Sequence, residues 1–105
     1  MVIYEVNLRV RNEAAEDVAL WLPRHIGRML GFEGFLRATW YYREAEGDVQ
    51  QWTVVYHVSN RRLLQRYLET GAAEMRRETS DHFGDAVQGD RRILFERETF
   101  GRPGD

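Results

Sequence analysis

The sequence contains neither cysteine nor lysine. The absence of cysteine excludes thiol nucleophiles, disulfides, iron–sulfur clusters and Cys-ligated zinc. All 15 basic residues are arginine, so no lysine can form a Schiff base with a substrate or with pyridoxal phosphate. A chain without disulfides fits a reducing compartment, and neither a signal peptide nor an apolar run of about 20 residues is recognisable. We therefore expect a cytoplasmic protein that does not enter a membrane.

Other chemical signatures are missing as well. The sequence has no glycine-rich phosphate loop, no GxSxG motif and no paired-histidine metal motif. Its net charge of -2 and pI of about 5.9 provide no overall positive field for nucleic acid. We expect one domain over residues 1–100 with a flexible tail over 101–105, no bound cofactor and no metal site.

What the sequence does contain is a clear alternation of apolar and polar residues at its start. Over residues 2–10 one side carries Tyr4, Val6, Leu8 and Val10, and the other carries Glu5, Asn7 and Arg9. This period of two predicts a strand with one buried side. The following segment, 12–31, has the helical period, with Asn12 as its expected N-cap and a bend expected at Pro23.

Two aromatic and β-branched stretches, 35–45 and 50–59, predict a hairpin that turns at Gly47-Asp48. In the second stretch Trp52, Val54, Tyr56 and Val58 share the buried side. In the first, Leu36, Ala38, Trp40 and Tyr42 are expected to face inward, and Arg37, Thr39, Tyr41 and Arg43 outward. A single bulge would invert this assignment.

A second helix is expected after Ser59 or Asn60, either of which can cap it. Gly71 interrupts this helix, which resumes and ends near Gly84. The last strand is expected over 91–100, and the pattern leaves its facing open.

The order strand, helix, strand, strand, helix, strand predicts a ferredoxin-like α+β sandwich. Right-handed crossovers place both helices on one face of a four-stranded antiparallel sheet, with the first and third strands at its centre. Glu5, Asn7 and Arg9 then lie beside Thr53, Val55 and His57 on the face without helices, which we call the open face.

Three interpretations of the open face compete. RNA recognition needs stacking aromatics on the central strands, where this chain has Asn7 and Val55, so we reject it. A polar face exposed to water needs no further explanation. Ile3, Tyr41 and Val55, together with Ile93 and Phe95 if the last strand faces that way, add apolar area that favours a homodimer packed through this face.

A family of short bacterial proteins, domain-of-unknown-function family 4286, resembles this chain in seven stretches: IYEVNL at 3–8, WLPRHIGRML at 21–30, GF at 34–35, VVYHV at 54–58, YLETGAAEMR at 67–76, HFGD at 82–85 and RRIL at 91–94. Its members are similar to the dimeric α/β-barrel superfamily. The resemblance implies a ferredoxin-like fold and dimerisation, and it implies no activity.

That superfamily includes monooxygenases without a cofactor and haem-degrading monooxygenases. By resemblance to the haem-degrading group, His82 would be the iron ligand, Asn7 would contact iron-bound oxygen and Tyr67 would pack against the macrocycle. However, Asp81 and Asp85 surround His82 with negative charge, and Tyr67 stands where that group has a tryptophan. A surface role for His82 is the simpler interpretation.

The remaining candidates are histidines and arginine pairs. His57 on the open face could act as a general base oriented by Glu5, or it could belong to a structural polar network. His25 lies on the apolar side of the first helix and is expected to be a hydrogen-bonded core residue. The arginine pairs at 61–62, 76–77 and 91–92 could hold an anion if the fold brought them together, and otherwise they are solvated.

The sequence therefore predicts a homodimeric, non-enzymatic binding or regulatory protein. Its dimer cavity, lined by Glu5, Asn7, Arg9 and His57, would hold a small polar molecule. The alternative is a monooxygenase-like or haem-handling enzyme of the same fold, which would need a sizeable apolar pocket.

Overall fold

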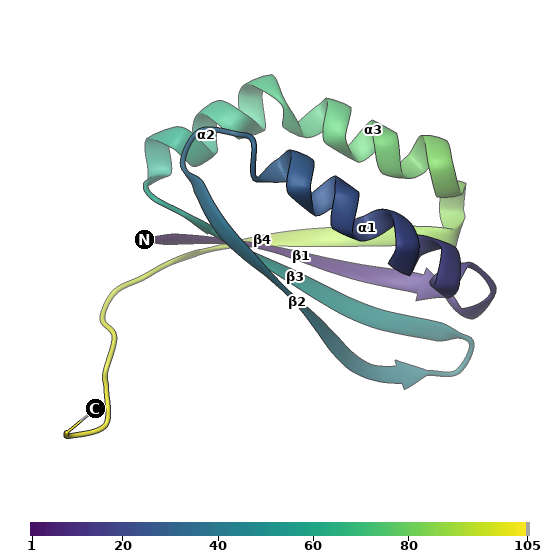
Figure 1. Cartoon of the computed structure of the whole chain (residues 1–105), viewed down its shortest axis with the longest axis horizontal. Helices are drawn as coiled ribbons and strands as arrows, with labels where there is room; N and C mark the ends of the chain where they lie inside the picture. Colours follow the sequence, from purple (N-terminus) through teal and green to yellow (C-terminus); the bar gives the residue numbers. More distant parts are fainter. Residues whose placement is uncertain (105) are drawn as a thin grey trace.

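Three helices cover one face of a four-stranded antiparallel sheet, and the other face is open (Figure 1). This computed structural model describes residues 1–104. The strand order is β2-β3-β1-β4, which confirms the predicted ferredoxin-like fold. Along the chain the elements are β1 (Val2–Arg11), η1 (Asn12–Ala14), α1 (Ala15–Met29), β2 (Phe35–Glu46), β3 (Val49–Val58), α2 (Arg61–Thr70), α3 (Ala72–Phe83), η2 (Gly84–Ala86) and β4 (Val87–Phe95).

The central strands bury the sides that their alternation predicted. Tyr4 of β1 pairs with Tyr56 of β3, and both are 2% exposed. Their rings meet those of Phe35 and Tyr67, with Tyr4 and Tyr67 centroids 5.8 Å apart at a steep angle. Edge-to-face contacts of this kind add stability beyond apolar burial. An aromatic cluster therefore joins the sheet to α2.

The expected facing of β2 is wrong at one position. Phe35 pairs with Val58 and Arg37 pairs with His57, so Leu36 is the extra residue of a bulge. Phe35 is consequently the buried residue, and Leu36 is 57% exposed. Beyond the bulge, Ala38 and Trp40 pack against the core as predicted.

Tyr42 lies on the same inner side as Trp40 but is 73% exposed. Its ring packs edge-on against Trp40 and Trp52. The inner face of β2 therefore ends in an exposed aromatic side chain.

The helix boundaries follow the predicted signals at the second helix but not at the first. Asn60 caps α2 by accepting a hydrogen bond from the backbone N–H of Leu63 at 2.9 Å, and Gly71 separates α2 from α3. Asn12 is not the N-cap of α1: it begins η1, and its side-chain amide donates a long hydrogen bond of 3.5 Å to the carbonyl of Gly47. Pro23 lies inside α1 on its exposed side.

The last strand corrects two expectations. It spans Val87–Phe95 rather than 91–100, and after it residues 96–104 form no helix or strand and extend away from the helices (Figure 1). Ile93 pairs with Tyr4 and Phe95 with Val2, so both side chains lie on the helix side of the sheet. Leu94, opposite Ile3, lies on the open face in their place. Within residues 1–104 no helix is long and apolar enough to span a membrane.

Candidate ligand-binding site

The open face carries the predicted polar residues, but they divide among separate partners. Glu5 accepts a hydrogen bond of 2.7 Å from Nε of Arg92, its neighbour on β4. The carboxylate is mostly covered, with its side chain 13% exposed. Glu5 is thus already paired within its own chain.

Asn7 is the centre of a second polar group on this face. Its side-chain carbonyl accepts a hydrogen bond of 2.8 Å from the Thr53 hydroxyl, and its amide donates one of 3.2 Å to Asp90. These contacts link β3, β1 and β4 across the sheet. Because both ends of the Asn7 amide are occupied, the group holds the register of the strands.

His57 and Arg9 lie at different places on the open face. His57 Nδ1 is 3.5 Å from Nη2 of Arg37, while Arg9 is exposed opposite Gln51. Partial burial lowers the pKa of His57, and the charge of Arg37 lowers it further, while Glu96 opposes the shift. The structure therefore places His57 beside an arginine, and Glu5 is paired with Arg92 instead of orienting its ring.

The three residues of the haem hypothesis do not converge. Asn7 lies on the open face, whereas Tyr67 is buried on the helix side and His82 is exposed near the end of α3. His82 Nδ1 lies 3.0 Å from the backbone carbonyl of Glu78, one turn earlier on the same helix. One haem cannot contact side chains on both sides of the sheet, so these residues do not fit that group.

A cavity of about 160 Å³ opens between the sheet and the helices. Aromatic and aliphatic side chains form most of its wall, and its polar groups come from all three α-helices and from the strands β1, β3 and β4. Its lining comprises Tyr4, Val6, Leu8, Val18, Trp21, Leu22, His25, Met29, Val54, Tyr56, Tyr67, Met75, Arg76, Thr79, Ser80, Val87, Gly89 and Arg91. A mainly apolar cavity with a few polar groups is the usual form of a small-molecule site.

The edge strand β4 places a glycine and an arginine on the cavity side of the sheet. Its inward positions Gly89 and Arg91 stand opposite Leu8 and Val6. A Cβ atom at Gly89 would lie 3.2 Å from Leu8 Cδ2 and 3.3 Å from the Asn7 carbonyl oxygen, so the strands leave little space for a larger residue there. Since Gly89 adds no side chain and Arg91 is exposed, β4 contributes little apolar bulk to this end of the core.

Two polar atoms in the cavity wall are buried without a hydrogen-bond partner in the part of the chain that the structure describes. They are the hydroxyl of Tyr4 and Nδ1 of His25. A third group, the Tyr67 hydroxyl, donates only to the sulfur of Met29, at 3.3 Å, and thioether sulfur is a weak acceptor. Burying a polar group unpaired costs about 1–3 kcal/mol, so a ligand with polar atoms would gain by pairing with this wall.

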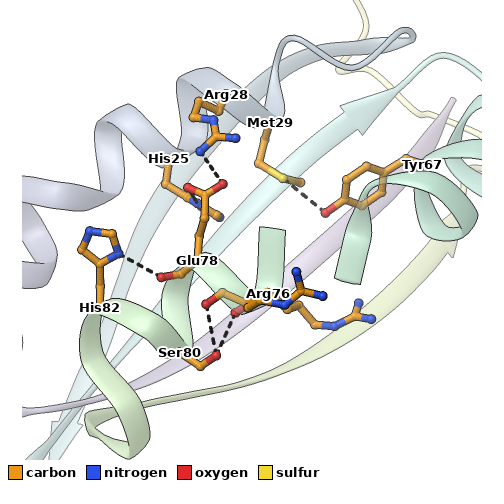
Figure 2. Close-up of polar contacts among 9 residues, drawn as sticks. His25, Arg28, Met29, Tyr67, Arg76, Glu78, Ser80 and His82 are labelled. Atoms are coloured by element: carbon orange, nitrogen blue, oxygen red, sulfur yellow. Dashed lines mark hydrogen bonds and ion pairs between the residues drawn. The ribbon is translucent and has the colours of Figure 1, made fainter. Parts of the chain in front are cut away.

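His25 differs from the sequence expectation in its partners (Figure 2). The expected hydrogen bond is absent among the described residues: its Nδ1 stays 4.0 Å from Oε1 of Glu78, whose carboxylate forms an ion pair with Arg28. Its ring stacks on Trp21 with centroids 4.6 Å apart. Burial lowers the pKa of His25. The negative charge of Glu78 opposes this decrease, and the positive charges of Arg28 and Arg91 add to it. The imidazole is therefore neutral at pH 7 and can accept or donate a proton.

The depressed pKa of His25 predicts a pH dependence of stability. Its pKa is below 6.5 in the folded state and near 6.5 in the unfolded chain, so the folded state binds fewer protons in this window. The free energy of unfolding should fall as the pH drops below about 6.5. Denaturant unfolding of wild type and His25→Gln between about pH 7.5 and about pH 5.5 checks this. An equal loss in both proteins would contradict the assignment.

The sequence alone does not reveal this cavity as a site. It places His25 in the core, and Tyr4 and Tyr56 among the buried residues, without bringing them to one space. Arg91 on the inner side of β4 is the available signal, since a charged residue rarely faces a core. The facing of that strand is open from the sequence, so the signal could not be used.

The comparisons with known proteins start with the family models. The model of a domain of unknown function, DUF4286, matches residues 1–97, which include the whole sheet and all its helices. This chain belongs to the DUF4286 family. No curated protein is similar enough to this DUF4286 chain to count as a match.

Solved structures show what the DUF4286 fold is similar to. A candidate antibiotic biosynthesis monooxygenase from Deinococcus radiodurans superposes with a TM-score of 0.75 at 15% identity, covering 99% of this chain and 100% of that one. A variant of SnoaB, a cofactor-independent oxygenase from Streptomyces nogalater, gives 0.69 at 16% identity, with 96% and 98% covered. A further candidate monooxygenase, from Bacillus cereus, gives 0.63 at 12%, with 96% and 98% covered. At these identities the likeness establishes the fold alone.

Proposed function

We propose that this DUF4286 protein binds a small organic molecule in the cavity between its sheet and its helices. The observation that carries the proposal is the pair of unpartnered buried atoms, Tyr4 Oη and His25 Nδ1, in a mainly apolar wall. Native proteins pair nearly all buried polar groups, and a bound group is one explanation for an exception. A ligand with a polar atom facing inward could pair with one of these two atoms.

The size of the cavity limits the ligand. Its volume is about 160 Å³, and an apolar cavity of about 150 Å³ accommodates a benzene ring. A ligand enclosed by this wall therefore has the size of one ring with small substituents. Polycyclic molecules would need the helices to move away from the sheet.

We propose further that two chains pack through their open faces. Ile3, Val55 and Leu94 form an apolar region at one end of this face, and Leu94 is 43% exposed. Covering these side chains would remove apolar area from water. Four polar residues would then line or border the interface: Glu5, Asn7, Arg9 and His57. Binding of a small polar ligand by these residues, between the two subunits, remains a prediction.

A second candidate function is that of an oxygenase without a cofactor. The fold neighbour SnoaB is described as a cofactor-independent oxygenase, and a neutral His25 beside the cavity could take a proton from a bound phenol. Oxygen consumption with a bound phenol, lost in His25→Gln while binding persists, would favour the enzyme. Binding without any oxygen consumption favours the binding protein.

Thr79→Phe tests the cavity directly. Thr79 is a half-buried residue of α3 in the cavity wall, so a phenyl group there would fill the space without a change deep in the core. We expect benzyl alcohol, followed by amide NMR shifts, to bind the wild type and to bind Thr79→Phe roughly tenfold more weakly. Arg77→Phe, on the same helix but outside the cavity lining, is the matched control and should behave as wild type. Equal binding by all three would refute the site.

A further inference from the structure

Two arginines from different elements belong to the exposed part of the cavity lining. Arg76 comes from α3 and Arg91 from β4, and both belong to the cavity lining and are exposed. Among the described residues, neither forms an ion pair, whereas Arg11, Arg28, Arg66 and Arg92 each pair with a carboxylate. Two arginines without a carboxylate partner among the described residues therefore line the same small cavity.

Arg91 occupies an unusual position for a charged residue. It lies on the helix side of the sheet, opposite the buried Val6. Burial is the main cause of the lowered pKa of His25, and the positive charge of Arg91 lowers that pKa slightly further. Burial also raises the pKa values of Tyr56 and Tyr67, and the charge of Arg91 opposes this rise. Arg76 acts on the pKa of Tyr67 in the same direction. Both charges thus act on the inside of the cavity.

From this geometry we infer that the ligand is a single-ring organic acid whose carboxylate lies between Arg76 and Arg91. The inference rests on the proposed binding function and names the class of molecule that the site takes. The apolar wall, which includes Leu22, Val54 and Met75, encloses the ring. The planar guanidinium fork matches the geometry of a carboxylate, and charge-assisted hydrogen bonds are the stronger kind.

The inner wall adds a second element of recognition. Tyr4 Oη and His25 Nδ1 are the unpartnered atoms away from solvent. A hydroxyl on the ring, directed inward while the carboxylate stays at the opening, could pair with one of them. A hydroxybenzoate should therefore bind more tightly than benzoate, because benzoate leaves both atoms unpaired.

The test compares a charged and a neutral probe of the same ring size. Benzoate and benzyl alcohol are titrated into wild type, into the double variant Arg76→Gln with Arg91→Gln, and into Arg77→Gln as the control on the same helix. We expect wild type to bind benzoate roughly tenfold more tightly than benzyl alcohol, and the double variant to bind the two probes with similar affinity. Arg77→Gln should retain the preference. Circular dichroism verifies that each variant is folded.

The outcomes separate this inference from the function on which it rests. Suppose that Thr79→Phe weakens the binding of benzyl alcohol, but wild type binds benzoate no more tightly than benzyl alcohol. The cavity site is then supported, and the specificity for an acid is overturned. The acid specificity is overturned as well if the double variant keeps the preference for benzoate. If neither probe binds wild type, both the cavity function and the inference fail.

Discussion

Replacing Trp52 by alanine is expected to lower the free energy of unfolding by about 3–5 kcal/mol. Trp52 is 2% exposed and is among the largest buried side chains. Its ring meets Trp40 at 5.1 Å between centroids, and its Nε1 donates a hydrogen bond of 3.2 Å to Gln50 Oε1. The substitution removes these contacts and leaves a cavity in the core, because the closely packed sheet cannot collapse to fill it.

Denaturant unfolding of wild type and Trp52→Ala measures this loss from the midpoint, provided that the slope is unchanged. Tyr42→Ala is the matched control: Tyr42 contacts the same tryptophan but is 73% exposed, so its loss should stay below about 1 kcal/mol. A similar loss of unfolding free energy in both variants would mean that the side chains around Trp52 pack less tightly than its burial indicates.

The second large effect concerns the proposed dimer. Leu94→Glu places a carboxylate in the apolar region of the open face, beside Ile3. A two-fold interface contains the substitution twice, and burying unpaired charge costs several kcal/mol. We therefore expect the dissociation constant of the dimer to rise by at least about a hundredfold. The monomer should fold normally, because Leu94 is already 43% exposed in the single chain.

Light scattering or analytical ultracentrifugation over a range of concentrations measures this change. Leu20→Glu is the control, because Leu20 is 78% exposed on α1, away from the open face. It should leave the dissociation constant unchanged. A wild-type chain that stays monomeric overturns the dimer, and a dimer indifferent to Leu94→Glu places its interface elsewhere.

Strong local patterns made much of the fold predictable. The alternation in β1 and β3 is clean, and both strands bury the predicted sides. Asn60, Gly71 and Gly84 mark helix boundaries through their own backbone and side-chain chemistry, and the structure confirms each of them. Features that depend on neighbours within a few residues can be read from one sequence.

The errors arise where a distant partner decides the local structure. The bulge at Leu36 adjusts β2 to its pairing with β3, and nothing within 35–45 marks it. Asn12 contacts Gly47, 35 residues away, rather than capping its own helix. Similarly, β4 takes its register and facing from β1, since QGDRRILF has no consistent alternation.

The candidate site shows the same division. The sequence by itself determined the residue types available for chemistry and excluded thiol and lysine mechanisms. It also placed four polar residues on the face opposite the helices, because period-two alternation assigns the two sides of a strand: Glu5, Asn7, Arg9 and His57. It could not bring His25, Arg76 and Arg91 together. These come from α1, α3 and β4, and only the packing of the helices on the sheet makes them neighbours around one cavity. That packing depends on the sum of many weak long-range contacts, which no local pattern in the sequence records.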